Sequence, residues 1–152
     1  MTTVTVGSDL AVEPSAVWRR LVDVDRLVVE DHDLDLVDVE GRGDLHPGAR
    51  VVVSRRHDRR LSTYDIRVLD AVPERLLALA VTAGRESWLV EARLRTHEHG
   101  TELLVTAQLD PDATPGSVIR GLARPLDIGL YHEVTELLER WVRHTTARTA
   151  MC

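Results

Sequence analysis

The side chains best suited to chemistry in this sequence are one tyrosine near the C-terminus and three polar residues in the middle of the chain. In order of preference, the candidate catalytic residues are Tyr131, Arg55, Tyr64 and Asp65. A phenol or a carboxyl group can transfer a proton, and a guanidinium can bind an anion or a polarised carbonyl. Catalysis by so few groups would rest mainly on holding the reacting molecule in position.

Tyr131 lies beside an apolar stripe of an expected C-terminal helix. A helix turns by about 100° per residue, so Tyr131 and the adjacent His132 cannot both face one cavity. We expect the Tyr131 hydroxyl to reach a bound molecule and His132 to lie in solvent. The alternative is that Tyr131 only marks the amphipathic edge of the stripe. The stripe residues expected to contact the molecule are Leu126, Leu130 and Val134.

Alternation along the expected strands assigns the remaining candidates to faces. Tyr64 and Ile66 share one face, whereas Asp65 points to the other. We expect the apolar faces to line the interior, and plain core packing is the alternative. The expected cavity walls are Tyr64, Ile66, Trp88, Val90 and Val53.

Arg55 shares a strand face with Val51 and Val53. In that position it could present its guanidinium to an anionic or carbonyl group in the interior. The alternative places Arg55 at the end of its strand, in water. Both interpretations stay open at this point.

The sequence gives little support to metal, cofactor or nucleophile chemistry. His97 and His99 share one side of a hairpin tip, but zinc needs three or four converging ligands and no third is identifiable, so we expect no metal. The motifs G-x-S-x-G, G-x-G-x-x-G and the P-loop are absent, so we expect no cofactor. Cys152 is the last residue, and we do not expect it to act as a nucleophile. The carboxylates of residues 31–35 suit a solvated edge.

Composition indicates one bacterial globular domain, with residues 1–146 as the domain and 147–152 as a short flexible tail. A single cysteine excludes a disulfide framework. Neither a signal peptide nor an apolar run of about 18–20 residues is evident, so we expect a cytoplasmic protein without a membrane span. The net charge of −6 argues against nucleic-acid binding. Lys, Asn and Phe, whose codons are AT-rich, are absent, which indicates a GC-rich genome.

The expected elements are a strand, two short helices, six strands and a long helix. Residues 2–12 read as the first strand, residues 13–15 open a helix, and residues 26–30 form a second helical turn. Short loops join the next strands into an antiparallel meander. These strands are expected at residues 34–39, 49–56, 61–72, 76–83, 88–96 and 101–109.

The expected C-terminal helix begins near Thr114 and runs to about Thr146, with one apolar stripe and a bend or break near Pro125. The stripe contains Ile119, Leu122, Ala123, Leu126, Leu130, Val134, Leu137, Leu138 and Trp141. The sheet and the helix each have one apolar side to bury. We therefore expect the sheet to wrap around the helix and to leave a cavity between them.

Four short motifs follow one another along these elements. They are Pro14-x-x-Val17-Trp18-x-x-Leu21-x-Asp23, Gly48-Ala49-Arg50-Val51, residues 68–76, and Gly100-Thr101-Glu102-Leu103. In this order, residues 2–145 resemble the START/polyketide-cyclase superfamily, also called SRPBCC or helix-grip proteins. The resemblance implies an α+β helix-grip fold, in which a curved antiparallel sheet of about seven strands surrounds a long C-terminal helix above a deep hydrophobic pocket.

Members of that superfamily bind lipids, sterols, quinones, plant metabolites or polyketides, and some are aromatase/cyclases without shared catalytic residues. The resemblance implies that this chain binds an apolar small molecule and acts as a polyketide cyclase/aromatase or related natural-product enzyme, metal-free and of a cyclase or dehydratase type. The alternative is a non-catalytic carrier of a lipid, quinone or metabolite. Only five residues are aromatic, fewer than is common in polyketide cyclases.

We expect a monomer or homodimer. A third interpretation is a protein partner that docks on the outer face of the sheet or on the basic cluster at residues 55–60. That cluster otherwise suits a solvated hairpin tip.

Overall fold

The computed structural model describes residues 3–23, 25–26, 34–40, 45–57, 60–84, 86–110, 135–143 and 145, with the backbone alone for residues 34–40, 57 and 60. Most of these residues form a seven-stranded antiparallel sheet. Its strands are β1 (Thr3–Leu10), β2 (Leu34–Glu40), β3 (Arg50–His57), β4 (Arg60–Val72), β5 (Leu76–Ala83), β6 (Glu86–His97) and β7 (Gly100–Leu109). Among the described residues, helical structure occurs in α1 (Pro14–Val22) and at residues 25–26, 135–143 and 145. Among the described residues, no helix is both long and apolar enough to cross a membrane.

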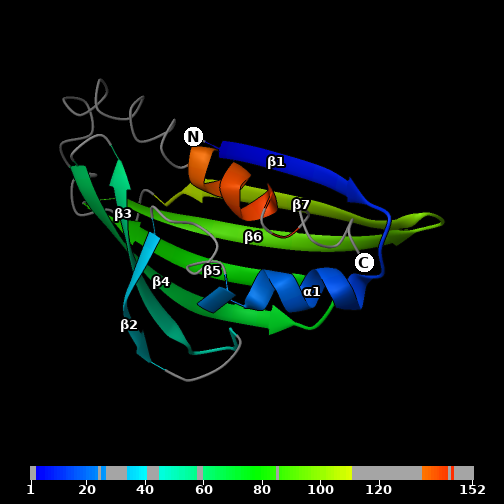
Figure 1. The fold of residues 1–152 in the computed structure, drawn as a ribbon, viewed down its shortest axis with the longest axis horizontal. Helices are drawn as coiled ribbons and strands as arrows, with labels where there is room; N and C mark the ends of the chain where they lie inside the picture. Colours follow the sequence, from blue (N-terminus) through cyan, green and yellow to red (C-terminus); the bar gives the residue numbers. More distant parts are fainter. Residues whose placement is uncertain are drawn as a thin grey trace.

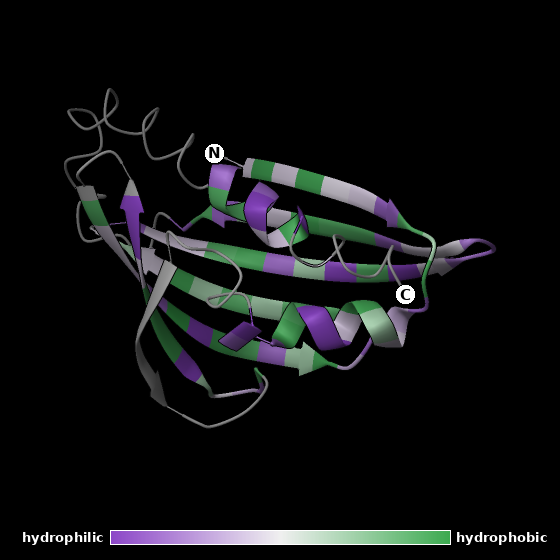
Figure 2. Ribbon diagram, viewed as in Figure 1, coloured by the Kyte–Doolittle hydropathy of each residue, from purple (hydrophilic) through white to green (hydrophobic). Residues whose placement is uncertain are grey.

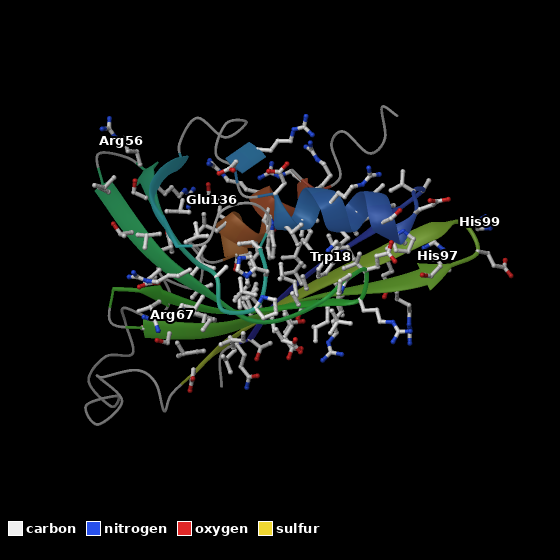
Figure 3. All side chains as sticks on the ribbon, turned by 90° about the horizontal axis from the view of Figure 1, so that it is seen from below. Trp18, Arg56, Arg67, His97, His99 and Glu136 are labelled. Atoms are coloured by element: carbon white, nitrogen blue, oxygen red, sulfur yellow. The ribbon has the colours of Figure 1, made fainter. Side chains whose placement is uncertain are left out.

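The strands lie in the order β1-β7-β6-β5-β4-β3-β2, so β2 to β7 form a meander and β1 pairs with β7. Register shifts between Leu36 and Asp38 in β2, and between Val68 and Asp70 in β4, are β-bulges, which bend a sheet. The sheet is curved, and its β2–β4 end rises toward the side on which the helices lie (Figures 1 and 3). This architecture confirms the predicted α+β helix-grip fold.

Alternating side chains divide the sheet into an apolar concave face and a mixed convex face. Along β6, Trp88 and Val90 are buried, whereas Leu89 between them is 41% exposed. Figure 2 shows the corresponding bands of hydrophobic and hydrophilic residues along the central strands. Strand residues of one parity therefore face the helices, and those of the other parity face outward.

Helix α1 packs on the concave face near β6 and β7. Pro14 occupies the first turn of α1, where a missing backbone N–H has no cost. Arg19 and Arg20 lie in the last turn, where their positive charges interact favourably with the negative end of the helix dipole. Val17 and Leu21 are almost fully buried and join one core with residues of the sheet and of the C-terminal helix. Both helices lie on the same side of the sheet (Figure 3).

The predicted strands agree with the observed ones to within a few residues at their ends. The first strand ends at Leu10 instead of continuing to Val12. Residues 27–30 of the predicted second helical turn, Pro125 and the tail at 147–152 lie outside the described residues, as does most of the predicted C-terminal helix. The described part of that helix, residues 135–143 and 145, is helical.

The β6–β7 hairpin requires a glycine where β7 begins. Gly100 has φ +146, and a Cβ placed on it would lie 1.9 Å from the carbonyl oxygen of Leu10 and 2.9 Å from the Cα of Ala11. These atoms belong to the backbone just after β1, so they cannot rotate away. Next to Gly100, the buried Thr101 donates a hydrogen bond from its hydroxyl to the carbonyl of Val12 at 2.8 Å. The chain that leaves β1 is therefore held tightly against this hairpin.

We predict that Gly100→Ala lowers the free energy of unfolding by about 3 kcal/mol, because it combines an unfavourable φ with a backbone collision. Gly84→Ala is the matched control, since Gly84 also has a positive φ (+61) but nothing lies within 4 Å of its added Cβ. Gly84→Ala should lower the free energy of unfolding by only about 1 kcal/mol. Urea denaturation of both variants measures the difference, and equal losses would contradict the predicted collision.

Candidate ligand-binding cavity

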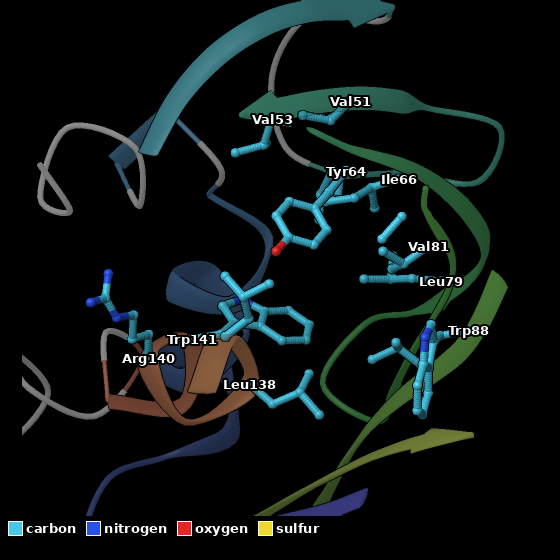
Figure 4. Close-up of a pocket in the computed structure, with 14 residues that line it drawn as sticks. Val51, Val53, Tyr64, Ile66, Leu79, Val81, Trp88, Leu138, Arg140 and Trp141 are labelled. Atoms are coloured by element: carbon cyan, nitrogen blue, oxygen red, sulfur yellow. The ribbon is translucent and has the colours of Figure 1, made fainter. Parts of the chain in front are cut away.

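An apolar cavity of about 130 Å³ lies between the concave face of β3–β6 and residues 135–143 (Figure 4). One water molecule takes up about 10–15 Å³ by this measure, so the cavity has room for roughly ten. Ten waters fill about 300 Å³ of liquid, which is the lower end of the range for small-molecule sites. The lining residues are Leu45, Val51, Val53, Tyr64, Ile66, Leu79, Val81, Ala83, Trp88, Val90, Leu137, Leu138, Arg140 and Trp141.

The register of the sheet builds the curved wall of the cavity. Residues paired across antiparallel strands point to the same face. One row across the sheet is therefore Val51–Ile66–Val81–Trp88, and a second row is Val53–Tyr64–Ala83. The structure thus brings together five of the residues expected to line the interior, namely Tyr64, Ile66, Trp88, Val90 and Val53.

The opposite wall comes from one side of the C-terminal helix. Leu137 and Trp141 are four residues apart and so share a helix face, with Leu138 beside them. Leu138 is buried in the core, whereas Leu137 and Trp141 are only partly buried. Figure 4 shows Trp141 pointing from the helix into the space below Tyr64.

Few polar groups reach the cavity. The Tyr64 hydroxyl points inward, toward the side formed by the helix (Figure 4). Trp88 is 2% exposed, and its indole N–H has no hydrogen-bond partner in the part of the chain that the structure describes. Among the described residues that line the cavity, Arg140 is the only charged one. The cavity therefore combines apolar walls with a few hydrogen-bonding groups.

Arg55 lies in the interior and not at a solvated strand end. Its side chain is 1% exposed, and its Nη2 donates a hydrogen bond to Oε1 of Glu136 at 2.7 Å. Nη2 of Arg140 lies 3.4 Å from the same carboxylate oxygen. Glu136 precedes Leu137 on the helix, so this ion pair joins β3 to the helical wall at the edge of the cavity.

Asp65 does not join this group, because it lies on the convex face of β4. It forms a bidentate ion pair with Arg50 of β3, with N–O distances of 3.0 Å from Nε and 2.8 Å from Nη2. The hydrogen bonds from Arg50 hold the pKa of the Asp65 carboxyl below its usual value of 3.8. As strand alternation predicts, Asp65 and Tyr64 point to opposite faces of the sheet, so the candidate catalytic residue Asp65 does not line the cavity.

Several sequence candidates are not placed at the cavity. Tyr131, Leu126, Leu130 and Val134 lie outside the described residues. His97 and His99 lie at the β6–β7 hairpin tip, away from Glu136 (Figure 3), and Nε2 of His97 is 3.7 Å from Asp9. Within the described ranges, no three His, Cys, Asp or Glu side chains gather in a way that would hold a metal ion.

Glu136 is a site residue that the sequence patterns did not indicate. A partner 81 residues away in sequence leaves no local pattern. The available signal was that alternation puts Arg55 on the inward-facing side of its strand. A buried guanidinium requires a carboxylate or another acceptor close by. The register of β5 against β4 also places Val81 and Ala83 in the wall, which alternation within β5 alone does not reveal.

No known protein-family model matches the chain, and neither does any curated protein sequence. Solved structures do match it over nearly its whole length. Ara h 8.0201 has a TM-score of 0.72 at 16% identity, with 99% of each chain covered. A protein from Mycobacterium smegmatis has a TM-score of 0.68 at 17% identity, covering 98% of this chain and 91% of that one.

A third similar structure is DynU16, a protein from the dynemicin biosynthetic locus, with a TM-score of 0.61 at 16% identity. The match covers 96% of this chain and 46% of DynU16, so this chain spans about half of that protein. At these identities the comparisons establish the fold alone.

We predict that Asp65→Asn lowers the free energy of unfolding at pH 7 by about 0.5–1 kcal/mol, because the partly exposed Arg50–Asp65 pair is screened by solvent. A carboxyl whose pKa is lowered by folding stabilises the protein above its unfolded pKa and loses that effect as pH falls. The difference between wild type and variant should therefore shrink below about pH 3.8. Chemical denaturation at pH 7 and pH 3 measures it.

Asp70→Asn serves as the control, since Asp70 is exposed and accepts a hydrogen bond only from its neighbour Ala71 within the described residues. A loss for Asp65→Asn that does not change with pH would argue against the ion pair as its cause.

Proposed function

We propose that this protein binds an apolar small molecule in the cavity between β3–β6 and residues 135–143. The observation that carries the proposal is the cavity itself. Of its described lining residues, all except Arg140 are uncharged, and their side chains are mainly aliphatic or aromatic. An apolar space of this size stabilises a ligand by removing its apolar surface from water.

The few polar groups in the cavity suit ligand orientation. The Trp88 N–H can donate to an oxygen of the ligand, since an unmet buried donor is costly. The Tyr64 hydroxyl can both donate and accept. Figure 4 shows Trp88 and Arg140 on opposite sides of the cavity, with the Arg140 guanidinium directed away from it, so Trp88 and Tyr64 are the groups suited to contact a ligand.

We predict that Val81→Phe weakens binding of the neutral fluorescent probe N-phenyl-1-naphthylamine at least tenfold. Val81 lines the cavity, and a larger side chain would occupy the space that the probe needs. Leu89→Phe is the control, because it adds an aromatic ring to the exposed face of neighbouring β6. Probe fluorescence titrations measure both affinities. If wild type does not bind the probe, or if both variants bind it equally, this cavity is not the binding site.

A second candidate function is conversion of the bound molecule, as in a cyclase or dehydratase. Two observations favour it, namely the inward-pointing Tyr64 hydroxyl and the structural likeness to a protein from a biosynthetic locus. In this role the Tyr64 hydroxyl would donate its proton to a carbonyl oxygen of the substrate.

We predict that Tyr64→Phe separates the two functions. If the protein cyclises a linear poly-β-carbonyl thioester, the variant should lose about 100-fold in turnover while its probe affinity changes by less than threefold, because only the hydroxyl is removed. Product formation followed by chromatography and mass spectrometry measures turnover. Unchanged turnover in Tyr64→Phe would exclude Tyr64 as the proton donor.

A further inference from the structure

The buried guanidinium of Arg55 has more hydrogen-bond donors than the described protein satisfies. Its side chain is 1% exposed, and Nη2 donates to Glu136. Nε and Nη1 are also buried, and neither has a hydrogen-bond partner among the described residues. A charged group held out of water with unmet donors is costly, so these N–H groups favour an acceptor, and an anionic acceptor most of all.

Arg55 is not itself among the lining residues, but its neighbours in the fold place its guanidinium beside the cavity. Val53, two residues earlier on the same face of β3, lines the cavity. On the opposite wall, Glu136 is adjacent to the lining residue Leu137, and Arg140, which also approaches Oε1 of Glu136, lines the cavity itself. The guanidinium of Arg55 is therefore bracketed by cavity residues from both the sheet and the helix.

Glu136 by itself does not satisfy the hydrogen-bond donors of Arg55. It contacts Arg55 through one nitrogen only, and the same carboxylate oxygen is also approached by Arg140. Its side chain is 38% exposed, so water weakens its effect on the buried guanidinium. A second anion is thus electrostatically favoured beside Arg55.

We propose that Arg55 is an anion-binding group at the edge of the cavity, and that the bound molecule is an apolar compound bearing a carboxylate or similar acidic group. The apolar body lies against Val53, Tyr64 and the helical wall, and the anion accepts hydrogen bonds from Nε and Nη1 of Arg55. This site depends on the proposed binding function, because an anion without an apolar body would gain little from the rest of the cavity.

The test compares two probes of nearly equal shape, 2-naphthoate, which is anionic at pH 7, and 2-naphthamide, which is neutral. Isothermal titration calorimetry measures the affinity of each for wild type, Arg55→Met and Arg93→Met. Arg93 is the control because it pairs with Glu91 on the exposed convex face. Wild type and Arg93→Met should bind naphthoate about 10–100-fold more tightly than naphthamide, as expected for charge-assisted hydrogen bonds. Arg55→Met should lose this preference while its affinity for naphthamide stays within about threefold.

Glu136→Gln provides a second measurement in case Arg55→Met does not fold. Removing the competing carboxylate should strengthen naphthoate binding several-fold and leave naphthamide binding unchanged. Equal affinities of wild type for the two probes, or a preference that survives Arg55→Met, would overturn the anion site and leave the proposed binding function intact. If wild type binds neither naphthalene probe nor N-phenyl-1-naphthylamine, the proposed binding function fails, and the anion site fails with it.

Discussion

The apolar concave face of the sheet must be shielded from water, and the way the helices cover it determines the rest of the structure. Helix α1 packs directly on β6 and β7, where Val17 and Leu21 are almost fully buried. Toward β3 and β4 the sheet curves upward, and the C-terminal helix lies across the hollow (Figure 3). The side chains in this region, such as Val53 and Ala83, are too short to reach across it, so the curvature leaves a cavity.

The Arg55–Glu136 ion pair connects the two walls at the edge of this cavity. A buried arginine is stable only with partners close to it, and Glu136 supplies one from the helix at 2.7 Å. The position of residues 135–143 over the sheet is therefore linked to the electrostatics of the interior. A ligand anion bound to Nε and Nη1 of Arg55 would repel the nearby Glu136 carboxylate. Binding would therefore be coupled to this contact between the sheet and the helix.

The structural likeness to Ara h 8.0201 and DynU16, at 16% identity, concerns the backbone and not the chemistry inside it. Function in such a fold depends on which side chains line the cavity. Here the wall is mostly aliphatic, with Trp88, Trp141 and Tyr64 as the aromatic residues among those described. Under the proposed function, this mainly apolar wall, with a donor at Trp88 and the Arg55 guanidinium beside it, would select a ligand by shape and by a small number of polar contacts.

Local sequence patterns were enough to establish the order of elements and the faces of the strands, because a period of two assigns Tyr64 and Ile66 to one side without any knowledge of the folded chain. The same patterns put Asp65 on the opposite face, but they could not identify its partner Arg50 or the partner of Arg55. Those features depend on strand register and on the packing of residues 135–143 against a strand about 80 residues away, and such non-local contacts leave no periodic signal. Only the folded chain reveals that Asp65 pairs with Arg50 outside, that Glu136 meets Arg55 inside, and that the curved sheet leaves space beneath the helix.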